Sequence, residues 1–133
     1  MKSEFDAIMK SRNLDAIVVF GNAEHNPPMY YLTGGGHVSH ATVIKKRGED
    51  AAYFHNDMER DEAAKSGLKL IPYSKYDYEA LLKKANGDLL LASALRNQLM
   101  FEEVGVTKGR VGVYGNYDLS AIFGQLTHLQ KLL

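Results

Sequence analysis

A continuous apolar run near the N-terminus, from Ala16 to Phe20, constrains the fold more than any other feature of this sequence. Its β-branched and aromatic residues favour a strand, and the absence of an alternating polar position indicates burial on both faces. A strand of this kind belongs to a sheet that lies between layers of other structure. The run therefore predicts an α/β fold in which helices cover both faces of the sheet.

The following residues predict that this sheet is mixed. The strand-like runs 41–46 and 51–55 are separated by the turn-forming segment Arg47-Gly48-Glu49-Asp50, which indicates a β-hairpin. Further strands are expected at 68–71 and 111–114. The hairpin supplies an antiparallel pair, and helical crossovers between the other strands supply parallel pairs.

Helices are predicted wherever apolar residues recur at helical spacing between capping and breaking residues. A first helix is expected after Ser3, and others are expected at 57–66, 77–85, 89–104 and from residue 118 onward. Residues 21–28 are expected to form a loop, because the pair Pro27-Pro28 disfavours regular structure. The apolar stripe of the last helix still continues at Leu133, so we expect further polypeptide after it.

Composition excludes several classes of protein. The 133 residues fit one domain, and the 16 basic and 16 acidic residues give a formal net charge of zero, without the basic field of a nucleic-acid binder. No polybasic segment indicates binding to a membrane surface, and no apolar run approaches the length of a membrane span. The absence of cysteine excludes disulfides and thiolate chemistry. The expectation is a soluble, cytoplasmic domain.

No motif in the chain indicates catalysis. The glycines of Gly34-Gly35-Gly36 are not followed by the Lys-Ser or Lys-Thr of a phosphate-binding loop. His37 and His40 would point to opposite faces of an extended strand, and no His-Glu-x-x-His pattern is present. The spacing of the acidic residues does not favour a two-metal nuclease. We therefore expect neither a catalytic residue nor a metal site in these 133 residues.

Several ordered segments resemble the N-terminal domains of the creatinase, prolidase and aminopeptidase P family. Leu14-Asp15-Ala16 opens the first strand, and Tyr31-Leu32-Thr33-Gly34 follows it, as in that family. The hairpin, the charged helix after it and the strand Arg110-Val111-Gly112-Val113-Tyr114 resemble the family in the same order. The resemblance covers nearly the whole chain. The run Gly34–His37 departs from the family pattern, because many relatives have an aromatic residue directly after Thr-Gly.

The resemblance implies a ribonuclease-H-like α/β domain, spanning residues 1–133, that does not itself catalyse a reaction. In this family a following "pita-bread" domain holds two divalent metal ions, such as manganese, cobalt or zinc, and cleaves peptides next to proline. The implied partners are that catalytic domain, a second or further copies of the chain, and proline-containing peptides. The implied role is to shape the entrance of the active site and to hold the oligomer.

Two hypotheses follow from this resemblance. The first is an accessory domain of a metal-dependent Xaa-Pro peptidase, in which Tyr31, His37 and His40, beside the glycine-rich segment, are the residues expected to reach the rim of the substrate site. The second is a protein-interaction module of a catalytically inactive relative. The polypeptide after Leu133 distinguishes them, because five metal ligands there would indicate the enzyme.

Overall fold

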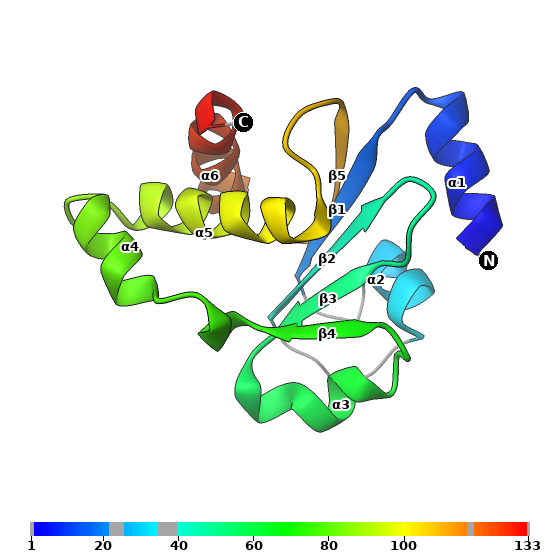
Figure 1. Ribbon diagram of the computed structural model, residues 1–133, viewed down its shortest axis with the longest axis horizontal. Coiled ribbons are helices and arrows are strands. Elements are labelled where there is room, and N and C mark those ends of the chain that lie inside the picture. Colours follow the sequence, from blue (N-terminus) through cyan, green and yellow to red (C-terminus); the bar gives the residue numbers. More distant parts are fainter. Residues whose placement is uncertain (1, 22–25, 35–39, 117–118, 133) are drawn as a thin grey trace. The chain divides into compact units, whose positions relative to one another are not determined.

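The computed structural model describes residues 2–21, 26–34, 40–116 and 119–132. Within these ranges six α-helices, two short 3-10 helices and five strands alternate along the chain (Figure 1). Their bounds are α1 Lys2–Ser11, β1 Ala16–Gly21, α2 Pro27–Thr33, β2 Ala41–Lys46, β3 Ala52–His55, η1 Asp57–Glu59, α3 Arg60–Ala64, β4 Lys69–Pro72, η2 Tyr73–Lys75, α4 Tyr78–Lys84, α5 Leu89–Val104, β5 Val111–Asn116 and α6 Leu119–Leu132.

The described strands form one open mixed sheet in the order β4-β3-β2-β1-β5. β2 pairs antiparallel with both β1 and β3, whereas β1 pairs parallel with β5 and β3 pairs parallel with β4. The hairpin expected from residues 41–55 is therefore present, and the helical crossovers supply the parallel pairs. The α/β class and the mixed sheet are confirmed.

The chain divides into two compact units. The first comprises Met1–Tyr73 and Gly109–Asn116 and contains the whole sheet with α1, α2 and α3. The second comprises Ser74–Lys108 and Tyr117–Leu133 and contains α4, α5 and α6, in which α5 packs against both of the other helices. Both units are therefore discontinuous in sequence, because β5, which belongs to the first unit, lies between α5 and α6 of the second.

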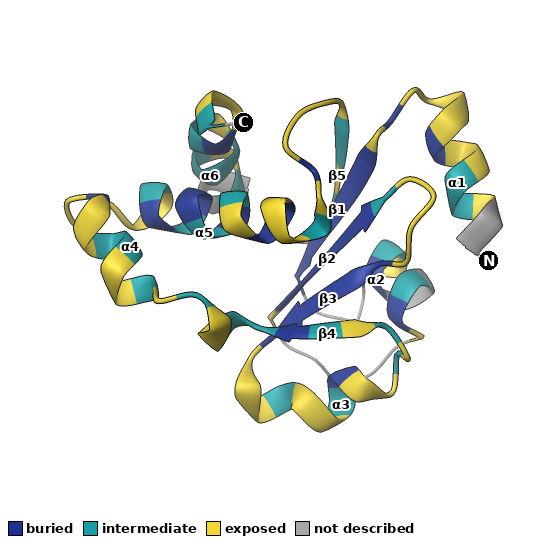
Figure 2. Cartoon of the chain, in the orientation of Figure 1, coloured by how far each residue is buried: buried dark blue, intermediate teal, exposed yellow. Residues whose placement is uncertain are grey.

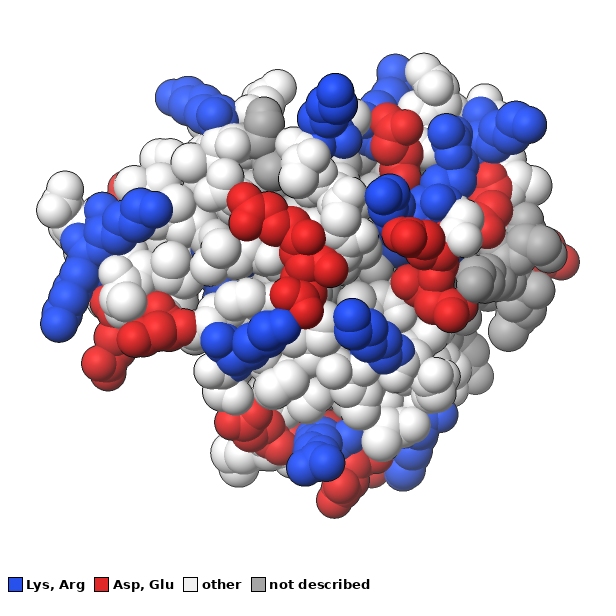
Figure 3. Space-filling view, viewed as in Figure 1, with Lys and Arg blue, Asp and Glu red and all other residues white. Residues whose placement is uncertain are grey.

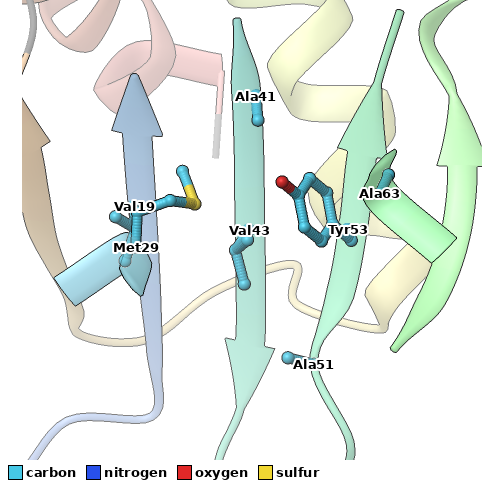
Figure 4. Packing of buried hydrophobic residues seen from close by; sticks show 7 residues of the cluster. All are labelled: Val19, Met29, Ala41, Val43, Ala51, Tyr53 and Ala63. Atoms are coloured by element: carbon cyan, nitrogen blue, oxygen red, sulfur yellow. The ribbon is translucent and has the colours of Figure 1, made fainter. Parts of the chain in front are cut away.

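The core of the first unit lies between one face of the sheet and its helices. Val19, Val43 and Tyr53 project from neighbouring strands toward Met29 of α2 and Ala63 of α3, and all five side chains are fully buried (Figure 4). Burial of a large apolar side chain contributes about 1.5–3 kcal/mol. This packing fixes the strand register, because a shift by one residue would turn these side chains to the opposite face.

The opposite face of the sheet is buried as well. Val18, Ile44 and Phe54 alternate with the residues of the first core and are at most 1% exposed. Figure 2 shows the central strands dark along their length, whereas much of the surface of α3 and α4 is exposed. β1 is therefore a strand buried on both faces, as its continuous apolar run predicts.

The expectation of a loop over residues 21–28 is wrong at its end, because helix α2 begins at Pro27. Proline is tolerated in the first turn of a helix, where a backbone N–H has no helical acceptor in any case. A helix of seven residues has little intrinsic stability, so its formation depends on packing. Met29 provides that packing, since its side chain is completely buried against the sheet.

Several element boundaries also differ from expectation: α4 is one residue shorter at each end, and β4 lies one residue later. The helix expected at 57–66 is divided into η1 and α3, the first helix begins at Lys2 rather than after Ser3, and β5 continues to Asn116. By contrast, α5 has the expected bounds. Asp88 caps its first turn by accepting from the N–H groups of Leu90 and Leu91, and Gly105 ends it with a left-handed φ of 83°.

Candidate functional site

One edge of the sheet collects the ends of four strands. β1, β3, β4 and β5 all run in the same direction, so their carboxyl ends lie together with the first residue of β2. We call this the carboxyl edge, defined by Gly21, Ala41, His55, Pro72 and Asn116. Ligands of open α/β sheets bind at edges of this kind, because loops that carry functional groups leave the strands there. The carboxyl edge is therefore the candidate functional site.

Two of the three residues expected at a substrate rim lie on segments next to this edge. His40 directly precedes β2 and is exposed. Tyr31 belongs to α2, which packs against β1 and β5, although the direction of its side chain is not described. His37 lies outside the described residues. A role of these residues at a substrate rim therefore stays a prediction.

Polar side chains at the carboxyl edge are buried and hydrogen-bonded to the fold. The side-chain amide of Asn26 donates to the carbonyl oxygen of Phe20 at 2.9 Å, which ties the start of α2 to the end of β1. Nδ1 of His55 lies 2.7 Å from the carbonyl oxygen of its neighbour Asn56. Asn26 and His55 are each 2% exposed. These two side chains hold neighbouring backbone segments in place, and their functional groups are not exposed to solvent.

A second hydrogen bond connects β2 to the segment after β4. Oγ1 of Thr42 lies 2.7 Å from the hydroxyl oxygen of Tyr73, and Thr42 is 4% exposed. No sequence motif pairs Thr42 with Tyr73 or Asn26 with Phe20. A polar residue directly beside a run of buried strand residues indicates a buried hydrogen bond. The sequence does not show which residue is the partner.

Two tyrosines whose hydroxyl oxygens are buried remain neutral across the physiological range of pH. Burial, followed by the negative charge of Glu59 and the neighbouring Tyr73, raises the pKa of Tyr53 in the first unit to about 12. Burial and then Glu103 raise the pKa of Tyr76 in the second unit to about 12. A phenol with such a pKa is almost entirely protonated at pH 7, so neither side chain supplies a phenolate base or nucleophile.

The described residues do not provide a metal centre. Among residues 2–21, 26–34, 40–116 and 119–132, no group of three or more His, Cys, Asp or Glu side chains is arranged to hold a metal ion. The residues described here therefore do not fit a divalent metal pair, which requires several such ligands around each ion.

Figure 3 shows acidic and basic side chains interspersed over the displayed face, in agreement with the balanced composition. Of the helices in the described part of the chain, none combines the length and the apolar character that crossing a bilayer requires.

The comparisons with known proteins agree with the observed topology. The model of the creatinase/prolidase N-terminal domain family matches residues 3–131. No curated protein sequence matches the chain. The match thus covers the strand, hairpin, helix and returning strand that the structure shows.

Two solved structures from Pyrococcus horikoshii OT3 are similar in fold. One is a dipeptidase, with a TM-score of 0.62, 15% identity, and coverage of 96% of this chain and 32% of that chain. The other is a prolidase, with a TM-score of 0.53, 15% identity, and coverage of 97% and 30%. The chain thus spans about a third of the length of either protein. Because the family model matches almost every residue, this chain belongs to the creatinase/prolidase N-terminal domain family.

Proposed function

We propose that this chain is the non-catalytic N-terminal accessory domain of a metal-dependent Xaa-Pro peptidase. The observation that supports the proposal most strongly is the family match over residues 3–131 in a chain whose fold also occurs in a dipeptidase and a prolidase of about three times its length. Its first partner would be a C-terminal catalytic domain of the same polypeptide. Proline-containing peptides would be the substrates of the complete protein.

The proposal assigns the hydrolytic chemistry to that catalytic domain. The described residues contain no group of three or more potential metal ligands, which supports assigning a manganese, cobalt or zinc pair to the other domain. The carboxyl edge would contribute to the entrance of the active site, with Tyr31, His37 and His40 as the residues that reach toward substrate. Contacts that hold a homodimer or larger oligomer, and a location in the cytoplasm, complete the proposal.

The test uses the complete protein encoded by the parent gene. We expect hydrolysis of Xaa-Pro dipeptides that is abolished by a chelator and restored by Mn²⁺ or Co²⁺. Hydrolysis that is insensitive to chelator would contradict the metal-dependent assignment. Absence of hydrolysis, together with specific retention of a protein partner, would instead favour an interaction module of an inactive relative.

The rim assignment has its own test. The substitutions Tyr31→Ala and His40→Ala in the complete protein are expected to raise KM for tripeptides and longer substrates while kcat changes less than twofold, because rim residues contribute binding rather than chemistry. His128→Ala, in α6, is the matched control and is expected to leave KM unchanged. A large loss of kcat with unchanged KM would show that the rim description is wrong.

A further inference from the structure

The first unit contains an apolar cavity that the proposed peptidase role does not use. Its volume is about 370 Å³, and it lies among α1, α2, β1 and β5. This volume falls within the range of roughly 300–1,000 Å³ that is typical of small-molecule sites. Protein interiors contain few voids larger than a water molecule, so a space of this size requires an explanation.

The cavity has an apolar floor and an exposed mouth. Ile17 and Val19 of β1 form the floor and are 4% and 0% exposed, and Met9 of α1 forms a wall. At the mouth, Ile8 of α1 is 50% exposed, and the exposed Arg12 directly follows the last residue of that helix. A ligand that enters between these two residues would cover Ile8 and place its body against the apolar lining.

The ring of Tyr114 forms one wall of the cavity, and its hydroxyl group lies at one end of that wall. A Cβ atom on Gly112 would lie 2.9 Å from Cε2 of Tyr114 and 3.0 Å from Cδ1 of Leu14. The absence of a side chain at residue 112 therefore lets the Tyr114 ring and Leu14 occupy this space beside β5. The same ring directs its hydroxyl oxygen to a position 3.4 Å from Nη1 of Arg12.

The positive charge of Arg12 at the mouth favours a negatively charged ligand. Arg12 is exposed and, within the described residues, forms no ion pair with a carboxylate. Glu4, the other charged residue of the lining, already has an interaction partner and lies about 12 Å away along the helix axis. A guanidinium beside a phenol hydroxyl provides several donors to one carboxylate, and such charge-assisted hydrogen bonds are stronger than neutral ones.

We propose that this cavity binds a small free monocarboxylate with an apolar body of about eight carbons. The carboxylate would accept hydrogen bonds from Arg12 and Tyr114, and the apolar body would lie against Phe5, Ile8 and Leu32 of the lining. An apolar cavity of about 150 Å³ holds a benzene molecule, so the larger volume here accommodates an alkyl chain or a phenylpropyl group.

The test is calorimetric titration of the chain with octanoate. For a ligand with ten non-hydrogen atoms we expect a Kd on the order of 100 µM or lower. Octanol and octylamine have the same apolar chain without the negative charge, and we expect each to bind at least tenfold more weakly. Equal binding of octylamine and octanoate, or no octanoate binding at 10 mM, would overturn the proposal.

Substitutions in the lining test whether octanoate binds in this cavity. Arg12→Gln is expected to weaken octanoate binding about tenfold, and Tyr114→Phe about threefold, since each removes donors to the carboxylate. Lys10→Gln is the control, because Lys10 is exposed on the same helix but does not line the cavity. Unchanged affinity in Arg12→Gln would contradict the assignment.

A last comparison separates a free carboxylate from a peptide terminus. The dipeptide acetyl-Phe-Leu carries a terminal carboxylate on an apolar residue, and we expect it to bind more weakly than octanoate because its buried amide groups lack partners in an apolar cavity. Binding of this dipeptide more than tenfold tighter than octanoate would overturn the choice of a free small carboxylate. None of these measurements depends on a peptidase assay. A failure of this proposal can therefore be distinguished from a failure of the proposed function.

Discussion

The two units of the chain are stabilised in different ways. In the first unit, residues far apart in the sequence meet: Lys45 of β2 pairs with Asp6 of α1, and the backbone of Arg110 donates to the carboxylate of Asp15 at 2.8 Å. In the second unit, Asp77 and Asp88 cap α4 and α5 within the first turn of each helix, and the long-range pair of Lys75 and Glu103 is partly exposed. The first unit therefore depends on buried contacts that the sheet register brings together, whereas the second combines local helix caps with more exposed contacts such as this pair.

The comparison indicates where a polar substitution should lower the stability of the chain most. A long-range contact in a packed sheet is buried and has no substitute when one partner is removed. A helix cap is exposed to water, which replaces part of the lost hydrogen bond. We therefore expect larger losses of stability from polar substitutions in the first unit than from those in the second.

The largest effect is expected from the buried ion pair. Lys45 is 2% exposed, and its Nζ atom lies 2.8 Å from Oδ1 of Asp6, which also accepts from the N–H of Gly48. Asp6→Ala would leave the ammonium buried without its carboxylate and should lower the free energy of unfolding by about 3 kcal/mol. Urea denaturation measures this loss.

The matched control for the ion pair lies in the second unit. Lys75 pairs with Glu103 but is 47% exposed, so Lys75→Ala should cost less than about 1 kcal/mol. A double substitution, Asp6→Leu with Lys45→Met, should recover most of the stability, since apolar residues replace both charges. Equal losses in Asp6→Ala and Lys75→Ala would remove the contrast between the units.

A second prediction concerns alkaline pH and one tyrosine from each unit. The pKa of Tyr53 and that of Tyr76 are each raised to about 12 from an unfolded value of 10.0. The unfolded chain therefore releases these protons first, so their contribution to stability is complete below pH 10 and is lost as the pH rises toward 12. Tyr53 should contribute roughly 2–3 kcal/mol to this loss, and Tyr76, which is only partly buried, should contribute less.

Phenylalanine variants separate the two contributions. Tyr53→Phe should reduce the loss of unfolding free energy between pH 10 and pH 12 by about 2 kcal/mol, and Tyr76→Phe should reduce it by less. Denaturant titrations at fixed ionic strength give these values. A pH dependence that is the same in both variants as in the unsubstituted chain would show that burial does not control the two phenols.

A third prediction tests the helix caps of the second unit. Oδ1 of Asp88 accepts from the N–H groups of Leu90 and Leu91 at 3.0 and 3.1 Å, while Oδ1 of Asp77 accepts only from that of Ala80. Asp88→Ala should cost about 1–1.5 kcal/mol and Asp77→Ala about 0.5–1 kcal/mol. Asp88→Asn keeps the acceptor and is the control. Thermal unfolding should rank the three variants in this order.

An effect of similar size is expected at the end of α5. Gly105 has a φ of 83°, a conformation that glycine adopts without strain and that other residues adopt at a cost. Gly105→Ala should lower the free energy of unfolding by about 1 kcal/mol, and Gly105→Asn by less, because asparagine tolerates the left-handed region. Equal costs for alanine and asparagine would show that the backbone conformation is not the cause.

Sequence reasoning was most successful where structure depends on neighbouring residues. The bounds of α5 follow from Asp88 and Gly105, and the hairpin follows from its turn, because both signals are local. It was wrong at Pro27, where a rule for helix interiors was applied to the first turn of a helix. Even there, the burial of Met29 that stabilises α2 depends on a sheet whose strands come from distant parts of the chain.

The candidate site was less predictable than the fold. His40 precedes β2 as expected, but its place at the carboxyl edge depends on the strand order, which the sequence does not specify. The partners of the Lys45–Asp6 pair are 39 residues apart, and those of the Thr42–Tyr73 pair are 31 apart. Pairs of such separation form only after the sheet is assembled. Residue spacing alone therefore does not identify them.

The most direct test of the account is the peptidase activity of the purified 133-residue chain, compared with the complete protein at the same molar concentration. With Xaa-Pro dipeptides and added Mn²⁺, we predict turnover on the order of 1 s⁻¹ or faster for the complete protein and no turnover for the 133 residues. Hydrolysis by the 133-residue chain at an enzymatic rate, retained after host peptidases have been removed, would contradict the assignment of the chemistry to a separate catalytic domain.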